Sequence, residues 1–577
     1  MLPWRALPET APLKDESLPS GSDAHAAPLP ATARARTSKE PLPTVAAALA
    51  HMFKARGVKR LFGLPGGGSS LDVIEAAHRL RMPFVLARHE CAAVFMAATT
   101  AELEGTLGVA LTTKGPGTAN AANGVAHAAL DRCPVAVLTD GFSPQIRRYV
   151  THQVYDQHAL LAPLVKGHSL LDDAQAGADI ERLLDVACAP LQGPVHFELT
   201  GVAARARIAT PPPGDAAPAS RASVRSLADA RALLGRVRRP VIVAGLEARR
   251  PEVTKALRRL LAELDCPALV TYKAKGVIAD ADPRLVGIFT GGLAEQATVQ
   301  QADLIVLVGV DPVELILQPW PYDIAVLEIG CAPHPVHYVR AQCAVHGDLA
   351  ITLKTLLGAG RRGDWQRARI AELRGSMRAT LAYTGDGTGV TPQQVVEIAA
   401  AAAAQLPRWP RVTVDAGAHM FSATAFWPCA KPNDLLISNG LATMGFALPA
   451  AIASALSDPR RHTVAFTGDG GLLMCMGELA TAVETRARIV VVVFNDGALS
   501  LIDIKQQQRK LPSRGVRWGR PDFALAMRAV GGRGYRANTL AAYRRALTQA
   551  FAGDGPALID VQVDPSGYPA QLAAMRG

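Results

Sequence analysis

The stretch from His462 to Ile504 constrains the fold more than any other part of this chain. Residues 462–467 and 488–494 are apolar, β-branched runs of the kind buried in parallel sheets, and the spacing of residues 473–484 predicts a helix between them. In such a strand–helix–strand unit the two strands run parallel, so their carboxyl ends open on the same edge of the sheet. The sequence therefore predicts an α/β fold built on doubly wound parallel sheets.

An aspartate follows each of these two strands. Asp469 stands in the Gly-Asp-Gly-Gly turn after the first strand, and Asp496 follows the second strand 27 positions later. Both carboxylates are expected on one rim, near the positive end of the helix that starts after Gly470 and Gly471. Glycines admit a phosphate, backbone N–H groups bind it, and carboxylates are ligands for a hard divalent cation. The pattern predicts a metal-bridged diphosphate site, and its alternative is an ordinary turn with two solvated aspartates.

The chain is too long for one core, and its 577 residues predict about three domains. The expected divisions are a disordered N-terminal extension at 1–40, α/β domains at 41–205, 222–358 and 388–577, and a proline-rich linker at 210–220. Strands are predicted at 83–90, 108–113 and 193–200, at 239–245, 266–272, 302–309 and 324–330, and at 411–417, 433–440, 462–467, 488–494 and 557–564.

Composition narrows the classes of function. The net charge is +11, but the arginines are scattered and form no basic stripe with interleaved aromatic residues, so we expect no nucleic-acid partner. The eight cysteines form no Cys-x-x-Cys pair, which argues against a zinc site and a disulfide framework. No apolar run is long enough to span a membrane, and residues 1–40 lack the apolar core of a signal peptide. We expect a cytoplasmic protein without a membrane partner.

Two further glycine patterns have more ordinary interpretations. The Gly-Asp-Gly at 385–387 follows no apolar strand, so we interpret it as a loop. Gly245 and Gly309 each follow a predicted strand of the central domain, which is consistent with a nucleotide crevice. Ordinary turns between a strand and a helix use glycine in the same way, so both interpretations stay open here.

Beyond the paired aspartates, four segments in chain order resemble the acetolactate synthase-like enzymes that use thiamine diphosphate, namely residues 61–74, 86–97, 112–135 and 438–456. The two turns resemble the family signature, Gly-Asp-Gly followed after about 27 residues by an asparagine or aspartate. The resemblance implies a pyrimidine-binding, a central and a diphosphate-binding domain. It also implies thiamine diphosphate as cofactor and Mg²⁺ bound by Asp469, Asp496 and the backbone carbonyl of Ala498.

Two residues carry the cofactor chemistry that the resemblance implies. Glu90, at the end of the strand predicted at 83–90, matches the glutamate that hydrogen-bonds the aminopyrimidine ring, a role that burial favours by raising the pKa of a carboxyl group. Met444 matches the large apolar residue that bends the cofactor, with the Ala442 carbonyl and the Met444 N–H on the pyrimidine edge. Alternatively, Glu90 is an acid favoured by a helix N-terminus and Met444 fills the core.

The resemblance assigns the remaining cofactor contacts to two loops and leaves the substrate groups less defined. Gln153 resembles an active-site glutamine and is given a catalytic role, whereas Lys114 either meets a substrate carboxylate or extends from the surface. His419 taken alone fits a surface histidine equally well. Leu499, Leu501 and Ile502 are expected in the pocket wall. The expected diphosphate contacts are Ala416, Gly417, Ala418, His419, Gly468, Gly470 and Gly471.

The implied reaction is decarboxylation of a 2-oxo acid with transfer of the acyl group to a second carbonyl, as in acetolactate synthase. The alternatives are a lyase or decarboxylase of another 2-oxo acid, a 2-hydroxyacyl-CoA or oxalyl-CoA, and a non-catalytic cofactor-binding scaffold. The glutamine–tryptophan pair of the anabolic acetolactate synthases and the paired histidines of pyruvate decarboxylases are absent.

The resemblance also bears on assembly and on a second cofactor. It implies a homo-oligomer, a dimer or a tetramer, with active sites shared between chains. FAD in the central domain is not favoured, because residues 310–320 lack the arginine- and aspartate-rich segment of the anabolic enzymes.

Overall fold

The computed structural model of the protein describes residues 42–171, 175–209, 220–316, 319–336, 339–387 and 389–576. The disordered extension expected at 1–40 and residues 210–219 of the expected linker lie outside this part of the chain. From Leu42 onward the chain forms one compact unit. None of the described helices has the length and apolar character needed to cross a membrane.

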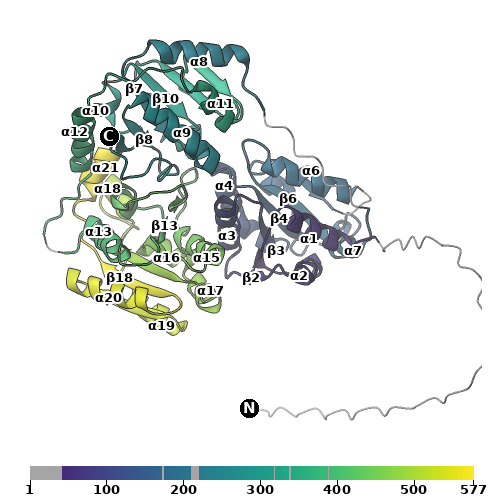
Figure 1. Ribbon diagram of the computed structural model, residues 1–577. Helices are drawn as coiled ribbons and strands as arrows, with labels where there is room; N and C mark the ends of the chain where they lie inside the picture. Colours follow the sequence, from purple (N-terminus) through teal and green to yellow (C-terminus); the bar gives the residue numbers. More distant parts are fainter. Residues whose placement is uncertain are drawn as a thin grey trace, which may run out of the picture. The chain divides into compact units, whose positions relative to one another are not determined.

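Three six-stranded sheets confirm the predicted fold class, and their paired strands run parallel with helices on their faces (Figure 1). The first and third sheets share one strand order: counted along each domain, it is second, first, third, fourth, sixth, fifth. The central sheet instead has the order third, second, first, fourth, fifth, sixth, which is the order of dinucleotide-binding folds.

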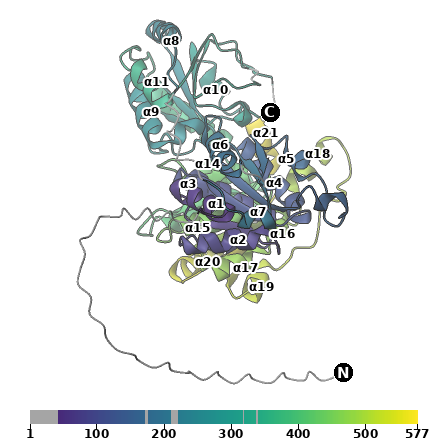
Figure 2. The same ribbon diagram turned by 90° about the vertical axis from the view of Figure 1, so that its right-hand side faces the viewer.

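The N-terminal sheet is covered on both faces, which explains its continuous apolar strands. Helices α1, α2, α6 and α7 pack on one face, and Figure 2 shows α1, α2 and α7 gathered there. Helices α3 and α4 pack on the other face. The strands are β1 (Leu61–Leu64), β2 (Phe84–Leu86), β3 (Gly108–Thr112), β4 (Val135–Gly141), β5 (His168–Leu170) and β6 (Val195–Thr200). The helices are α1 (Val45–Ala55), α2 (Ser69–Arg79), α3 (Glu90–Glu104), α4 (Pro116–Leu130), α5 (Gln157–Leu161), α6 (Ala176–Cys188) and α7 (Gly201–Arg205).

The central domain is joined to the third domain by α12 (Arg367–Thr380). Its strands are β7 (Pro240–Ala244), β8 (Ala268–Val270), β9 (Leu285–Ile288), β10 (Leu304–Val308), β11 (Val326–Gly330) and β12 (Cys343–His346). Its α-helices are α8 (Val224–Arg236), α9 (Pro251–Leu264), α10 (Gln296–Val299) and α11 (Leu349–Leu356).

The C-terminal domain repeats the strand order of the first, and α15 and α17 share one hydrophobic cluster with α3 and α4. Its strands are β13 (Arg411–Val414), β14 (Leu435–Ile437), β15 (Thr463–Gly468), β16 (Ile489–Asn495), β17 (Arg533–Ala537) and β18 (Ala557–Gln562). Its helices are α13 (Pro392–Ala403), α14 (His419–Phe426), α15 (Ala447–Ser457), α16 (Asp469–Cys475), α17 (Glu478–Glu484), α18 (Ser500–Gln508), α19 (Phe523–Ala529), α20 (Leu540–Ala552) and α21 (Tyr568–Arg576).

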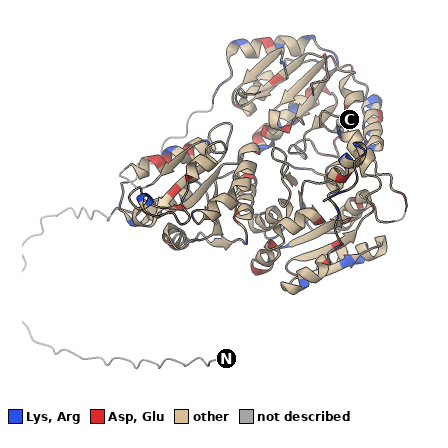
Figure 3. Ribbon diagram, turned by 180° about the vertical axis from the view of Figure 1, so that it is seen from behind, with Lys and Arg blue, Asp and Glu red and all other residues tan. Residues whose placement is uncertain are grey.

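Two local predictions are wrong. The strand expected at 83–90 ends at Leu86, and Glu90 instead opens α3, where the His89 ring accepts a hydrogen bond from the Cys91 N–H and caps the helix. The single helix expected at 473–484 is two helices, α16 and α17, separated at Gly477, because glycine is a poor residue for a helix interior. In Figure 3 the Lys and Arg positions are spread over many of the described helices and loops.

The turns after β7 and β10 are closed by carboxyl-bearing side chains of the central domain itself. A Cβ at Gly245 would lie 2.6 Å from Glu314 Oε2, and a Cβ at Gly309 would lie 2.8 Å from the Glu247 Cβ. The buried Glu314 carboxyl accepts hydrogen bonds from the Leu246 N–H (2.8 Å) and the Thr271 hydroxyl (2.5 Å). Acidic groups thus occupy the edge where such sheets bind nucleotides.

This burial predicts a pH dependence of stability. Burial raises the pKa of Glu314 to about 8, so the folded protein holds this proton more tightly than the unfolded chain does. Stability is therefore lost as the pH rises from about 5 to about 8. Glu314→Gln, which carries no charge, is expected to lose less stability over this range, by on the order of 1 kcal/mol. Thermal midpoints at pH 6 and pH 9 test this, and a parallel loss in both proteins would contradict it.

Candidate cofactor site

The two aspartates of the predicted metal site lie on one rim of the C-terminal sheet. Asp469 directly follows β15, Asp496 directly follows β16, and these strands are neighbours. The Gly497 N–H donates to Asp469 Oδ2 at 2.8 Å, so the turn that carries Asp496 is tied to Asp469. Asp496 accepts hydrogen bonds from the Ser500 hydroxyl (2.5 Å) and the Ala498 N–H (3.2 Å). The rim inferred from the spacing is thus present.

The electrostatics of this rim fit a bound cation. Asp469 is 2% exposed, and burial together with the charge of Asp496 raises its pKa to about 7. Burial also raises the pKa of Asp496. Two adjacent carboxylates that resist ionisation are stabilised when a divalent cation neutralises them. The described residues contain no group of three or more His, Cys, Asp or Glu side chains able to hold a metal.

Asp415 organises the loops around this rim, and the sequence analysis missed it. Its buried carboxylate accepts hydrogen bonds from the Thr467 hydroxyl (2.8 Å), the Gly445 N–H (3.0 Å) and the Phe446 N–H (2.8 Å). A side chain at Gly471 would collide with this carboxylate, so the glycine is required for the turn to approach it. Asp415 therefore joins the β13 loop, the β15 turn and the start of α15. The available signal was an aspartate directly after a short apolar strand.

His419 has the properties of a diphosphate contact rather than of a surface histidine. It is 3% exposed, and its ring stacks on Phe494 with centroids 5.1 Å apart. Burial lowers the pKa of His419 to about 4, so the ring is neutral at pH 7. Its Nε2 has no hydrogen-bond partner among the described residues. The Cε1–Nδ1 edge of the ring lies beside Gly468 and the Asp469 turn, because a Cβ at Gly468 would be 3.4 Å from both atoms, so His419 borders the rim where a diphosphate would lie.

The loop that carries Ala442 and Met444 reaches the same rim. Ala442 adopts a left-handed backbone conformation, with φ of 51°, which is uncommon for a residue with a side chain. A Cβ at Gly470 would lie 3.2 Å from the Met444 methyl carbon, so Met444 spans from its own loop to the glycine turn. This strained, extended loop fits a role against a bound ring.

Glu90 and Gln153 lie in the N-terminal domain and differ in setting. Glu90 is 8% exposed, and its Oε2 accepts a hydrogen bond from Asn120 Nδ2 at 3.1 Å. Gln153 is exposed and has a φ of 60°. The buried glutamine of this segment is Gln157, which accepts from the Gly115 N–H at 3.0 Å and donates to the Asp140 carbonyl at 3.0 Å. The hydrogen bonds of Gln157 therefore hold in place the loop that contains Gln153.

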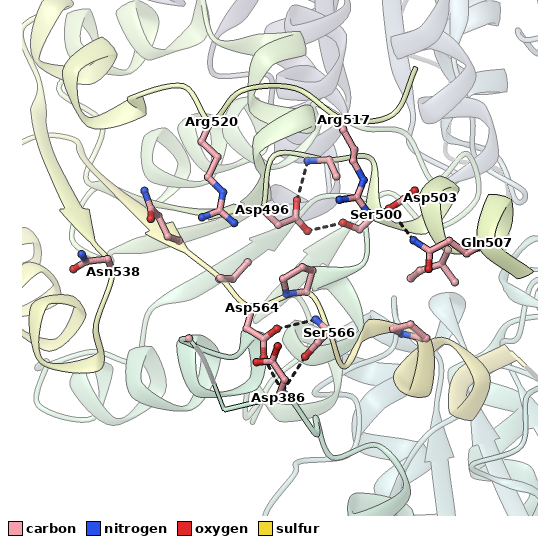
Figure 4. Close-up of a pocket in the computed structure, with 17 residues that line it drawn as sticks. Asp386, Asp496, Ser500, Asp503, Gln507, Arg517, Arg520, Asn538, Asp564 and Ser566 are labelled. Carbon is pink, nitrogen blue, oxygen red and sulfur yellow. Dashed lines mark hydrogen bonds and ion pairs between the residues drawn. The ribbon is translucent and has the colours of Figure 1, made fainter. Parts of the chain in front are cut away.

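A cavity of about 490 Å³ opens beside Asp496, as Figure 4 shows. Arg517 and Arg520 lie on one side of it and Asp564 on another. The loop at 385–387 is irregular as predicted, but Asp386 joins the cavity wall, where its N–H donates to Asp564. The sequence analysis missed these wall residues, because they come from separate loops. A hydrogen bond from the Trp518 N–H to the Gly497 carbonyl (2.9 Å) ties the segment of Arg517 to the turn that carries Asp496.

Comparison with known proteins agrees with the three-domain fold. Residues 43–160, 227–356 and 415–561 match the N-terminal TPP binding domain, the central domain and the C-terminal TPP binding domain of thiamine pyrophosphate enzymes. Thiamine pyrophosphate is another name for thiamine diphosphate.

Curated relatives extend the match along the chain. The acetolactate synthase of Bacillus subtilis (strain 168) is 28% identical over 535 residues, which cover 89% of this chain and 91% of the relative. The acetolactate synthase isozyme 2 large subunit of Escherichia coli (strain K12) is 28% identical, with 89% and 94% covered. The catabolic acetolactate synthase of Raoultella terrigena is 29% identical, with 89% and 93% covered. With all three domains matched in order, the chain belongs to the thiamine pyrophosphate enzymes.

Proposed function

We propose that this protein is a thiamine-diphosphate- and Mg²⁺-dependent carboligase that decarboxylates a 2-oxo acid and transfers the acyl group to a second carbonyl. The observation that carries the proposal is the joined carboxylate rim, in which the Gly497 N–H links the Asp496 turn to Asp469. The relatives named acetolactate synthases support the reaction class. The buried, hydrogen-bonded Glu90 counts against the alternative of a non-catalytic scaffold.

Different residues would contact the metal, the diphosphate and the pyrimidine ring of the cofactor. Asp469, Asp496 and the Ala498 carbonyl would hold Mg²⁺, and the neutral His419 ring would border the diphosphate beside Gly468. Ala416, Gly417, Ala418, Gly468, Gly470 and Gly471 would line the diphosphate. Ala442 and Met444 would contact the pyrimidine, and Glu90 would hold a proton at that ring. When bound, thiamine diphosphate supplies a carbon nucleophile that attacks the substrate carbonyl.

The substrate proposal is a small 2-oxo acid. Gln153 would orient it from the N-terminal domain. The Lys114 Nζ lies 4.7 Å from the centroid of the Phe142 ring, and this cation–π contact keeps a positive charge near the Gln153 loop. Such a charge complements a substrate carboxylate.

An assay with purified protein, thiamine diphosphate, Mg²⁺ and a panel of 2-oxo acids and acyl-CoA substrates tests the reaction. With pyruvate we expect CO₂ release together with acetoin after acid treatment of the product. CO₂ with aldehyde alone would favour a decarboxylase, and turnover of a CoA thioester alone would favour a lyase. No turnover of any of these substrates would reject the proposed reaction.

We further propose that the central domain holds no stoichiometric flavin. The support is the pair of turns after β7 and β10, where Glu314 and Glu247 fill the space next to Gly245 and Gly309. Side chains at this edge disfavour a nucleotide phosphate by occupying its place. A yellow protein that releases one flavin for each chain on denaturation would overturn this proposal.

The proposed assembly is a homodimer, or a dimer of dimers, in which each active site combines two chains. The support is an apolar surface next to Asp469: Leu473, Met474 and Met476 are 43%, 62% and 38% exposed. Large apolar side chains clustered beside a functional turn mark a surface that another chain covers. The second copy would present its Glu90 to this rim.

A further inference from the structure

The shared strand order gives the first and third domains corresponding parts. In each, the loop after the second strand leads to or contains a residue expected at the pyrimidine: Glu90 opens the helix after the β2 loop, and Met444 lies in the loop after β14. In each, a helix follows the third strand, α4 after β3 and α16–α17 after β15. Within one chain, the helix of each domain contacts the loop of the other through a buried acid.

Asp131, directly after α4, holds the loop that leads to Met444. Its Oδ1 accepts hydrogen bonds from the Gly440 N–H at 2.7 Å and the Asn439 N–H at 3.2 Å. Asp131 is 1% exposed, and the Lys273 Nζ of the central domain lies 3.8 Å from its Oδ2. Although burial disfavours its charge, Lys273 and His127 hold the pKa of Asp131 well below its usual range. The loop therefore meets a fixed anionic acceptor.

Two more side chains of α4 contact the same loop. His127 Nδ1 lies 3.0 Å from Ser438 Oγ, and Asn123 Nδ2 donates to Thr443 Oγ1 at 3.1 Å. Asn123, His127 and Asp131 are four residues apart, so they share one face of the helix. These three side chains therefore contact the loop between Ser438 and Thr443, the residue before Met444.

Glu478, the first residue of α17, holds the loop that leads to Glu90. Its Oε1 accepts hydrogen bonds from the Arg88 N–H at 2.8 Å and the His89 N–H at 3.0 Å. Glu478 is 1% exposed, and the Arg88 guanidinium pairs with Glu484 of the same helix at 2.5 Å. The two acids thus make equivalent contacts. Asp131 of the N-terminal domain accepts two consecutive backbone N–H groups from a loop of the C-terminal domain, and Glu478 of the C-terminal domain does the same for a loop of the N-terminal domain.

We propose that Asp131 and Glu478 are positioning residues that set opposite sides of the pyrimidine site: Asp131 places Ala442 and Met444, and Glu478 places Glu90. This inference rests on the proposed function and deepens it, because it assigns a separate effect to each acid. Asp131 governs the affinity for the cofactor, since its loop supplies the ring contacts. Glu478 governs proton transfer at the bound cofactor, since its loop sets the direction of the Glu90 carboxyl group.

The test uses Asp131→Asn and Glu478→Gln, which keep the shape of each side chain and remove its charge. The two readouts are the dissociation constant of thiamine diphosphate at saturating Mg²⁺, from tryptophan fluorescence, and the rate of deuterium exchange at the thiazolium C2 with cofactor saturating. We expect Asp131→Asn to weaken binding about 10- to 100-fold, the range for a lost hydrogen bond to a charged group, and to leave exchange unchanged. We expect Glu478→Gln to slow exchange by a similar factor and to leave binding unchanged.

Glu104→Gln is the matched control. Glu104 ends α3, and its partly buried carboxylate pairs with Arg60 (2.8 Å) and Lys59 (3.1 Å) at the end of the helix remote from Glu90. We expect it to lower the thermal midpoint and to change neither readout. If Asp131→Asn or Glu478→Gln does not fold, Asp131→Glu and Glu478→Asp keep the charge, displace the carboxylate, and are expected to show the same split.

The outcomes distinguish positioning roles for Asp131 and Glu478 from a purely structural role and from failure of the proposed function. Variants that lower only the thermal midpoint, or that change both readouts together, would overturn the inference. Parent protein that binds no thiamine diphosphate would overturn the proposed function itself. A loss of binding in one variant and a loss of exchange in the other is the result we expect.

Discussion

Replacing Asp469 with alanine is expected to weaken Mg²⁺-dependent binding of thiamine diphosphate by at least about 100-fold while the fold is retained. Asp469 is nearly fully buried, and burial with the nearby Asp496 charge raises its pKa to about 7. Without a cation, ionised Asp469 therefore lowers the free energy of unfolding instead of raising it. The variant loses a metal ligand but leaves no buried charge behind.

Isothermal titration with thiamine diphosphate and Mg²⁺, together with the thermal midpoint of the apoprotein, measures both halves of this prediction. Asp554→Ala is the control, because Asp554 is exposed in the turn before β18. It is expected to match the parent protein in both measurements. Parent-like cofactor affinity in Asp469→Ala would show that the metal lies elsewhere.

Co-expression of Glu90→Gln with Asp469→Ala is expected to restore about a quarter of normal activity, although each variant alone is inactive. In a mixed dimer with shared sites, one site receives both substitutions and the other receives the intact Glu90 and Asp469. Random pairing makes half of the dimers mixed, and half of their sites work. If each chain built its own site, every site would carry one substitution and no activity would return.

The test requires that the two chains exchange partners and that activity is assigned to the mixed species. Different affinity tags on the two variants allow the mixed dimer to be purified in two steps. Its activity is expected to be about half that of the parent dimer, because one of its two sites is intact. Activity at the level of the separate variants in this purified species would reject shared sites.

The paired aspartates were predictable from sequence because their positions follow from a local rule. Two buried parallel strands put their carboxyl ends on one edge, and Asp469 and Asp496 directly follow those strands. Asp415 also follows a strand, but its function depends on Gly445, Phe446 and Thr467, which no local pattern connects to it. Its role became visible only when the three loops were placed together.

Six strands were not predicted from the sequence: β1 and β4 lie inside the first sheet, and the other four have a common physical reason. β5, β9, β12 and β17 all lie at the edges of their sheets. An edge strand is not buried on all sides, so it needs no continuous apolar run: β17 is Arg-Gly-Tyr-Arg-Ala and β12 is only partly buried. The central strands β7, β10 and β16 are buried along their whole length and were all predicted.

Glu90 keeps its proposed role although the local structure predicted around it is wrong. The predicted strand through residue 90 ends at Leu86, so Glu90 opens a helix, as its structural alternative had it. That position nevertheless buries the carboxyl group and sets it against Asn120 of α4. The order of motifs along the chain identified the residue, whereas its backbone conformation depended on contacts with α17 that no local pattern records.

The rate of deuterium exchange at the thiazolium C2 of bound thiamine diphosphate tests the central claim most directly, because it needs no knowledge of the substrate. The account predicts that the protein with Mg²⁺ accelerates this exchange well above that of free cofactor. It also predicts that Glu90→Gln binds the cofactor with similar affinity but slows the exchange about 10²- to 10⁴-fold, the usual range for a general acid–base residue. Exchange in the parent protein no faster than in free cofactor, or exchange unaffected by Glu90→Gln, would contradict the account.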